Sequence, residues 1–388
     1  MALEPSRRSL LEWIDAWRAS PEPFAPGAFD PSVFEAHALQ RFGDHYAQID
    51  VYRAYCDAVG RRPEDVGSWR QIPLLPSSAF KRSAAQVEAA VVNPKFVFET
   101  SGTTDGAPGS VRLTCTEVYD AASLATFRHL VPTAKRVRCL SLVPGSDIRP
   151  KSSLGHMVDH LSGALSDRKT DALIVADPSG SNRQDHVDSA RLLEILRLAG
   201  RQSCGHETVP LVIFGTTIAL DVALRSWPAE VEIALPVGSI VMDTGGPKGR
   251  DRHIDRAEQH ARMASAWGVS ASHIVGELGM TELSSQRYET TLRAELCGDI
   301  TSTRAYVGPP WLRSVVLDPD TMQPVPLGTM GLVGHIDLAN IESCAFVLTG
   351  DLGVLVEVDP GVEGLRLHGR APGTVLRGCG LLIDEATG

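Results

Sequence analysis

Hydrophobic residues recur at helical spacing in the N-terminal part of the chain. Leu10, Ile14 and Trp17 form one series with gaps of three or four positions, and a second series runs from Phe34 to Phe42. Such spacing places apolar side chains on one face of an α-helix. Four prolines separate the two series, and proline interrupts a helix. The pattern predicts two amphipathic helices whose aromatic side chains lie in a core.

Between residues 96 and 300 the pattern changes to short apolar runs that alternate with helical stretches. The clearest helices are expected at 188–198 and 254–267. Strand–helix alternation is typical of an α/β fold with a largely parallel sheet. The expected strands are 96–98, 138–143, 172–176, 211–214, 240–242 and 273–275.

After residue 300 the apolar runs are short and separated by Gly, Pro and Asp, which predicts antiparallel β structure in a small barrel or sheet. The strands are expected at 314–317, 331–337, 353–358 and 365–367. We therefore divide the chain into a helical N-terminal part (1–95), an α/β core (96–300), a small β subdomain (301–368) and a C-terminal tail (369–388).

Composition and charge narrow the class of protein. The 37 basic and 47 acidic side chains give a net charge of −10, and the basic residues are scattered, which argues against a dedicated nucleic-acid-binding protein. No apolar run approaches the roughly 20 residues of a membrane-spanning helix. Glu12 and Asp15 interrupt the apolar stretch near the N-terminus, so no secretory signal is expected. The seven cysteines include no Cys-x-x-Cys pair, which argues against zinc or disulfides and predicts a cytoplasmic protein.

The stretch most informative about function, residues 99–110, follows an expected strand and contains five hydroxyl side chains and three glycines. Glycines allow the backbone to approach a ligand closely, and successive N–H groups can bind an anion. The same composition is also typical of a surface hairpin of turn residues. No Gly-Lys-Ser/Thr follows, so the stretch is not a Walker loop.

Four further short motifs follow in order, at 245–246, 278–282, 349–353 and 369–370. They read Gly-Gly, Leu-Gly-Met-Thr-Glu, Thr-Gly-Asp-Leu-Gly and Gly-Arg. Together with Thr-Ser-Gly-Thr-Thr at 100–104, they resemble the motifs of the adenylate-forming superfamily. That superfamily comprises acyl- and aryl-CoA synthetases, adenylation domains and luciferases. The resemblance implies the N-terminal core of that α/β fold, with parallel-rich sheets, flanking helices and a small antiparallel β subdomain.

The same resemblance implies an enzyme that activates a carboxylic acid with ATP and Mg²⁺. Thr281 would contact the α-phosphate, Glu282 would hold Mg²⁺, and Asp351 would accept hydrogen bonds from the ribose hydroxyls. Taken singly, Glu282 could instead be a charge at a helix N-terminus, and 349–351 a plain turn. The residues that the resemblance places around the nucleotide are Thr100, Ser101, Gly102, Thr103, Thr104, Gly106, Gly245, Gly246, Gly279, Asp351 and Arg370.

Two departures from the superfamily pattern matter. Pro108 or Gly109 stands where the loop lysine is usual, and Asp105 adds a negative charge. Lys81 and Arg112 are candidates for the missing cation. The C-terminal lid that follows Gly-Arg in most of the superfamily is expected to be absent or vestigial.

Four stretches resemble one subfamily, the acyl-protein synthetases of the bacterial fatty-acid reductase system (long-chain-fatty-acid–luciferin-component ligases). They are Ile-Pro-Leu-Leu-Pro with Phe-Lys in 72–81, Gly-Met-Thr-Glu-Leu-Ser-Ser-Gln at 279–286, Asp-Leu-Ala-Asn at 337–340 and Arg-Gly-Cys at 377–379. This resemblance implies that a fatty acid is activated and captured by a cysteine near the C-terminus. The acyl group would then pass to a partner reductase or acyltransferase.

Cys379 fits the acceptor role by position, since it lies between two glycines, nine residues after Arg370 and nine before the end. Arg377 would favour the thiolate, which is the nucleophilic form. The alternative is an ordinary buried cysteine. The other six cysteines are expected in the core, and Cys344 is the only other candidate acceptor.

The acid pocket is expected to involve Phe214, Gly215, His156 and His206, although both histidines could be structural. Two other functions stay open. The chain could load free CoA or a carrier-protein thiol, or it could be a catalytically weak nucleotide-binding subunit that organises a partner.

Overall fold

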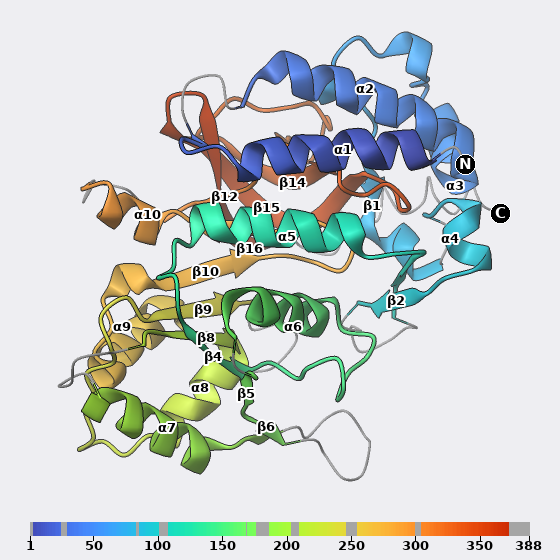
Figure 1. Ribbon diagram of the computed structural model, residues 1–388. Helices are drawn as coiled ribbons and strands as arrows, with labels where there is room; N and C mark the ends of the chain where they lie inside the picture. The colour runs from blue at the N-terminus through green and yellow to red at the C-terminus, as the bar shows by residue number, and fades with distance from the viewer. Residues whose placement is uncertain are drawn as a thin grey trace. The chain divides into compact units, whose positions relative to one another are not determined.

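The computed structural model describes residues 3–24, 29–82, 85–100, 108–167, 169–175, 186–202, 209–245, 254–298 and 304–371. The chain divides into two compact units (Figure 1). The first unit contains Met1–Thr126, Met280–Arg287 and Ala305–Gly388. The second contains Phe127–Gly279 and Tyr288–Arg304.

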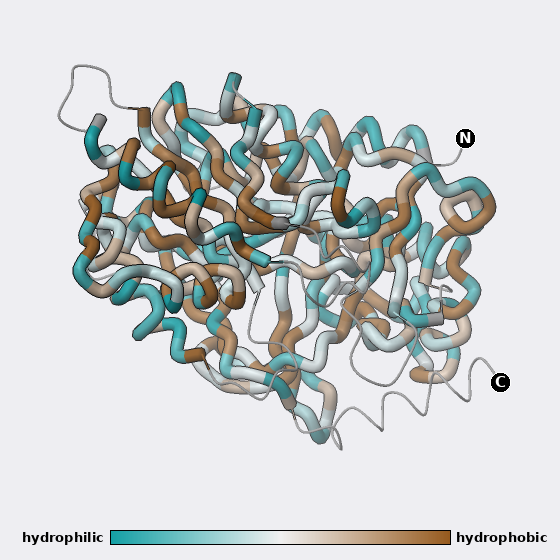
Figure 2. The backbone as a smooth tube through the Cα atoms, turned by 90° about the horizontal axis from the view of Figure 1, so that it is seen from below, coloured by the Kyte–Doolittle hydropathy of each residue, from teal (hydrophilic) through white to brown (hydrophobic). Residues whose placement is uncertain are grey.

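The helices of the first unit begin and bury one face as their sequences predict. At the start of α2, the Asp30 carboxylate accepts a hydrogen bond from Ser32 N at 2.8 Å, and Pro31 occupies the first turn. Hydrophilic and hydrophobic residues alternate along the helical coils in Figure 2. The helical elements are α1 (Leu3–Arg18), α2 (Pro31–Gln48), α3 (Asp50–Ala58), η1 (Pro63–Asp65), η2 (Trp69–Gln71), η3 (Ser77–Arg82) and α4 (Glu88–Val92). α5 (Glu117–Leu130) continues into the second unit.

The sheet of the first unit has the order β13-β14-β15-β16-β12. All these neighbours are antiparallel, and β1 pairs with β15 in parallel. Its strands are β1 (Leu75–Pro76), β12 (Tyr306–Val307), β13 (Leu312–Leu317), β14 (Met330–Asp337), β15 (Phe346–Asp359) and β16 (Val362–Arg370). Phe346 of β15 lies 6.0 Å from Phe42 and 5.6 Å from Tyr52 between ring centroids. The N-terminal helices and the C-terminal strands therefore share one core.

A separate hairpin of the first unit pairs β2 (Phe96–Glu99) with β3 (Ser110–Leu113). Thr100 N donates to Gly109 O, and Gly109 N donates to the Thr100 hydroxyl, each at 2.8 Å. These two bonds close the base of the loop predicted to bind phosphate.

The second unit contains a parallel sheet of order β10-β9-β8-β4-β5. Leu192 of α7, Leu220 of α8 and Trp267 of α9 are buried in one apolar cluster with strand residues such as Ile213 and Val241. The strands are β4 (Arg138–Leu142), β5 (Asp171–Ala172), β8 (Leu211–Thr216), β9 (Ile240–Thr244) and β10 (Ile274–Leu278), with a small β6 (Ile174–Val175) and β7 (His186–Val187) hairpin. The helical elements are α6 (Ser153–Leu165), α7 (Ser189–Gln202), α8 (Thr217–Arg225), α9 (Arg256–Trp267), η4 (Ala271–His273) and α10 (Thr291–Leu296), and β11 (Arg287–Glu289) begins in the first unit.

The expected α/β class is confirmed, and every expected strand overlaps an observed one. β15 begins at Phe346, seven residues earlier than expected, so the interpretation of 349–351 as a plain turn is wrong. In the structure, residues before 127 and after 304 pack into the same compact unit, and the expected division into four successive parts stays a prediction. Among the described helices, none is both long and apolar enough to cross a membrane.

Candidate active site

Thr281 lies beside the strand that leads into the predicted phosphate loop. Its hydroxyl donates to Glu99 O at 3.4 Å, and Glu99 is the last residue of β2. Thr281 and Glu282 form a half-buried turn that follows β10, so the alternative of Glu282 at a helix N-terminus is wrong. Of the predicted loop residues, Thr100 is described, while Ser101, Gly102, Thr103, Thr104 and Gly106 lie outside the described residues.

Buried Asp337 holds the backbone that follows this turn. One oxygen of its fully buried carboxylate accepts from Ser284 N at 2.9 Å and Ser285 N at 2.8 Å. The other accepts from the Ser285 hydroxyl at 2.8 Å and Ala339 N at 3.0 Å. Burial raises the pKa of Asp337, and these hydrogen bonds oppose that shift. Trp311 Nε1 donates to the Ser285 hydroxyl at 3.1 Å, which fixes that side chain as well.

Asn340 ties the same segment to Glu282 itself. Its Nδ2 donates to Glu282 O at 2.7 Å and to Cys344 O at 3.1 Å, while its Oδ1 accepts from Ser284 N at 2.9 Å. Asn340 is 1% exposed, and these three hydrogen bonds satisfy its buried side-chain amide.

The stretches 279–286 and 337–340, which both carried the subfamily resemblance, are therefore one hydrogen-bonded network. Sequence reasoning named both stretches and missed their contact. One feature of the sequence could have predicted this contact: two polar residues, Asp337 and Asn340, stand at the end of an apolar strand. Polar side chains that are buried at such a position need hydrogen-bond partners.

The motif at 349–353 lies in β15, opposite the end of β16. In the antiparallel register Asp351 faces Arg370, and the Arg370 Nε to Asp351 Oδ1 distance is 3.2 Å. The Thr349 hydroxyl donates to Val333 O at 2.7 Å and accepts from Asp351 N at 3.1 Å. The Asp351 side chain is 27% exposed, so its carboxylate can still accept hydrogen bonds from a ligand. Its ribose-binding role stays a prediction.

In the second unit, strands β8, β9 and β10 end at one edge of the parallel sheet, where α/β enzymes bind ligands. Gly245 directly follows β9 and has a φ of +74°, a conformation that favours glycine. The Thr217 hydroxyl lies 2.7 Å from Gly245 O and 2.6 Å from Asp243 Oδ1, which anchors this turn. Gly279 follows β10 at the same edge, while Gly246 lies outside the described residues.

Asp243, at the end of β9, is a buried charge that sequence reasoning did not identify. Its Oδ2 accepts from Arg256 Nε at 2.9 Å and lies 2.8 Å from His260 Nε2. Burial alone would raise the pKa of Asp243, but the hydrogen bond from His260, the charge of Arg256 and the hydrogen bond from Thr217 together lower it. The cluster positions the end of β9 and therefore Gly245.

The residues expected in the acid pocket differ in burial and packing. Phe214 in β8 is fully buried, with its ring centroid 6.1 Å from that of Phe127. A Cβ on Gly215 would lie 2.7 Å from Leu220 Cγ, so this glycine allows α8 to pack closely. His156 is half-buried in α6, and His206 lies outside the described residues. Their contact with an acid stays a prediction.

Among the described cysteines, three are buried and poorly suited to nucleophilic attack. Burial raises the pKa of Cys56 to about 12, that of Cys139 to about 11, and that of Cys344 further above its ordinary value. The Cys344 thiol lies 3.6 Å from Phe346 O, which argues against it as an acyl acceptor. Cys297 is exposed, so the expectation that it lies in the core is wrong. Cys379 lies outside the described residues.

At Glu282, the protein would supply a single carboxylate ligand to Mg²⁺. Within the described ranges, no group of three or more His, Cys, Asp or Glu side chains could hold a metal ion. Mg²⁺ in nucleotide enzymes commonly uses one or two carboxylates together with substrate phosphates, so a single carboxylate fits this ion.

Comparison with known proteins identifies the relatives. The family described as "Acyl-protein synthetase, LuxE" matches residues 14–387. The long-chain-fatty-acid–luciferin-component ligase of Vibrio harveyi is 25% identical over 151 residues, which cover 38% of this chain and 37% of that protein. The ligase of the same description from Aliivibrio fischeri is 38% identical over 50 residues, 13% of each chain. These alignments span well under two thirds of either relative.

Solved structures share the fold. An open conformation of 2-hydroxyisobutyryl-CoA ligase, in complex with 2-HIB-AMP and CoA, has a TM-score of 0.62 at 15% identity. The match covers 88% of this chain and 69% of that one. The same ligase in the postadenylation state with R3-HIB-AMP has a TM-score of 0.61 at 16% identity, over 89% and 69% of the two chains. The expected adenylate-forming fold is thereby confirmed.

Proposed function

The chain belongs to the LuxE acyl-protein synthetase family, and from this premise we propose that it activates a fatty acid with ATP and then carries the acyl group on its own Cys379. The observation that carries the proposal is the position of Thr281. Its hydroxyl donates to the backbone oxygen of Glu99, the last residue of β2 before the 100–109 loop, which supports a contact of Thr281 with the nucleotide phosphates.

In the first step a carboxylate oxygen of the acid attacks the α-phosphorus of ATP. A C–O–P mixed anhydride forms, the bond to the β-phosphate oxygen breaks, and pyrophosphate leaves. The Thr281 hydroxyl would donate to the α-phosphate, and the N–H groups of the loop would hold the leaving pyrophosphate. Mg²⁺ bound at Glu282 would offset the negative charge of the phosphates.

In the second step the Cys379 thiolate attacks the acyl carbon. The carbon–sulfur bond forms, the bond to the AMP oxygen breaks, and AMP leaves, while the thiol proton has passed to solvent. The thioester would then reach a partner reductase or acyltransferase. The glycines on either side of Cys379 support such a transfer because they permit many backbone conformations.

Lys81 is the residue we assign to the missing loop cation. It is exposed in η3, and its backbone N lies 3.3 Å from the position of a Cβ on Gly109, at the base of the loop. Arg112 lies in β3, where its backbone N donates to Gln86 Oε1 and its side chain is half-buried.

ATP–pyrophosphate exchange with a panel of fatty and aromatic acids tests the activation step. Exchange dependent on one acid class is expected, and Thr281→Ala should reduce its rate by about tenfold or more because a phosphate hydrogen bond is lost. Thr329→Ala, at an exposed position of the same unit, is the control. No exchange with any acid would leave the chain as a nucleotide-binding subunit.

A further inference from the structure

The connection between β14 and β15 contacts more of the proposed nucleotide site than the Thr-Glu turn. This connecting segment, residues 338–345, holds that turn through the bond from Asn340 Nδ2 to Glu282 O. Two residues further on, the buried Glu342 carboxylate accepts from Thr114, which directly follows β3 of the β2–β3 hairpin. One short segment of the first unit therefore contacts both the turn and the hairpin.

Glu342 binds the end of the hairpin through both of its carboxylate oxygens. Its Oε2 accepts from Thr114 N at 2.6 Å. Its Oε1 accepts from the Thr114 hydroxyl and, at 2.7 Å, from Arg7 Nη2 of α1. The Glu342 side chain is 4% exposed, and hydrogen bonds to a buried carboxylate are stronger than those between neutral groups. These bonds therefore fix the position of the hairpin end.

Gln86 makes a second link between the connecting segment and the hairpin. Its backbone forms an antiparallel β-bridge with Ser343 of the connecting segment. Its buried side chain contacts β3, where Nε2 donates to Ser110 O at 2.9 Å and Oε1 accepts from Arg112 N. Two separate side chains thus join the same pair of structural parts.

A buried histidine of α2 fixes the connecting segment itself. His45 Nδ1 accepts from Ala345 N at 3.2 Å, so its Nε2 carries the hydrogen and donates to Ile341 O at 3.3 Å. Burial and the charge of Arg41 lower the pKa of His45 to about 3, so the ring is neutral at pH 7. The neutral ring satisfies both backbone groups, which makes the segment a firm support.

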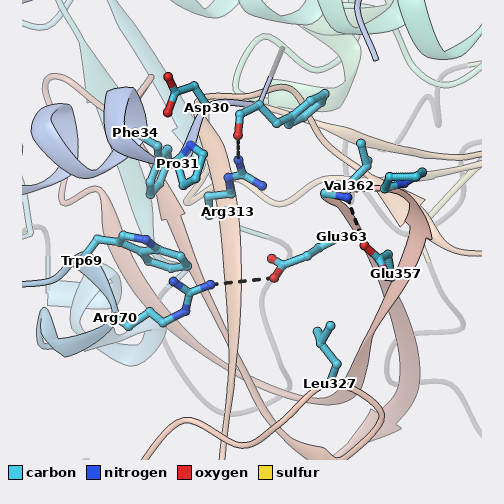
Figure 3. A pocket seen from close by; sticks show the side chains of 13 residues that line it. Asp30, Pro31, Phe34, Trp69, Arg70, Arg313, Leu327, Glu357, Val362 and Glu363 are labelled. Atoms are coloured by element: carbon cyan, nitrogen blue, oxygen red, sulfur yellow. Dashed lines mark hydrogen bonds and ion pairs between the residues drawn. The ribbon is translucent and has the colours of Figure 1, made fainter. Parts of the chain in front are cut away.

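An ion pair elsewhere in the first unit serves as a comparison. Glu363 of β16 lines a cavity of about 370 Å³, and its Oε1 lies 3.8 Å from Arg70 Nη2 of η2 (Figure 3). Glu363 and Arg370 are seven residues apart on β16, which corresponds to about 23 Å along a strand. This glutamate therefore pairs with an arginine outside the motifs and lies far from the predicted ribose-binding end of β16.

We propose that Glu342 and Gln86 are positioning residues for ATP binding. They hold the β2–β3 hairpin on the connecting segment, which also holds the Thr-Glu turn, so both parts of the site keep one relative position. This inference rests on the proposed function, which takes the hairpin and the turn as parts of the nucleotide site. Groups that are fixed before a ligand arrives lose little freedom on binding, which favours affinity.

Calorimetric titration of the whole chain with ATP and Mg²⁺, without any acid, tests this role. In Glu342→Gln the side chain keeps one acceptor oxygen, so it cannot accept from both Thr114 N and Arg7. We expect the Kd for ATP to rise about tenfold, with one site per chain retained. Glu363→Gln, the same chemical change in the comparison ion pair, should leave the Kd unchanged. Fewer sites with an unchanged Kd in Glu342→Gln would indicate a merely structural role and overturn the proposal.

Variants of the hairpin side provide a second test that keeps Glu342. Gln86→Leu should raise the Kd about tenfold, and Thr114→Val, which lacks only the hydroxyl bond, about fivefold. Thr114→Ser keeps both donors and should match wild type. These three variants decide the question if Glu342→Gln fails to fold.

Three results would overturn the proposal: an unchanged Kd in any of the folded variants Glu342→Gln, Gln86→Leu and Thr114→Val, an equal rise in Glu363→Gln, or no ATP binding by wild type. ATP binding without pyrophosphate exchange would refute acid activation alone. The Kd values would still decide the positioning role, so the two proposals fail distinguishably.

Discussion

Asn340→Ala should separate the positioning of Glu282 from the folding of the chain. The substitution removes the hydrogen bonds from the side-chain amide to Glu282 O in the half-buried turn and to Cys344 O of a buried residue. An unsatisfied buried polar group costs about 1–3 kcal/mol, so the loss of the bond to Cys344 O predicts a decrease of about 1–3 kcal/mol in the free energy of unfolding. Ser284 N retains the Asp337 carboxylate as an acceptor, which limits the loss.

The effect on activity should be larger than this stability loss suggests. Glu282 is the predicted Mg²⁺ ligand and Thr281 the predicted α-phosphate contact, and a displacement of about 1 Å at such groups can cost about 100-fold in rate. We therefore expect ATP–pyrophosphate exchange to fall by about 100-fold in a variant that is still folded by circular dichroism. Urea unfolding gives the stability, and exchange at saturating ATP gives the rate.

Asn93→Ala is the matched control, because Asn93 is exposed at the end of α4. It should change neither quantity. A folded Asn340→Ala protein that keeps its exchange rate within twofold of wild type would refute the claim that this network positions the Thr-Glu turn.

Three further substitutions test other parts of the account. Lys81→Met should weaken ATP binding about tenfold, as judged by the KM for ATP. Lys95→Met, at an exposed position directly before β2, should leave this KM unchanged. Gly215→Ala should destabilise the chain by about 1–3 kcal/mol in urea, because its Cβ would lie 2.7 Å from Leu220 Cγ. Asp243 has a lowered pKa in the folded state, so its stabilising contribution is present above its ordinary pKa of 3.8 and is lost as the pH falls through the folded value. Asp243→Asn should therefore destabilise the chain at pH 7 and reduce the loss of stability on acidification, measured by urea unfolding at each pH.

Local patterns predict the elements of this fold well. The spacing of Leu10, Ile14 and Trp17 corresponds to α1, and the apolar runs between 138 and 275 correspond to the parallel strands. These signals depend on residues that are neighbours along the chain. The strand that contains Asp351 was expected to begin later, because Thr349 and Gly350 are also typical of turns.

Contacts between distant residues could not be predicted in this way. Asp337 and Ser284 are 53 positions apart, and no periodicity links them. The packing of N-terminal helices against C-terminal strands is likewise a property of the whole unit. The motif residues themselves could be named from their order, whereas the residues that hold them, Asp337, Asn340 and Asp243, needed the structure.

Self-acylation at Cys379 is the central claim, and intact-protein mass spectrometry tests it most directly. Wild type and Cys379→Ala would each be incubated with ATP, Mg²⁺ and a mixed panel of fatty and aromatic acids. We predict a hydroxylamine-sensitive mass increase in wild type alone, equal to one acyl group, with release of AMP and pyrophosphate. Pyrophosphate and AMP release with no mass increase in either protein, or an equal increase in both, would contradict the assignment of Cys379 and point to CoA, a carrier-protein thiol or another cysteine as the acceptor.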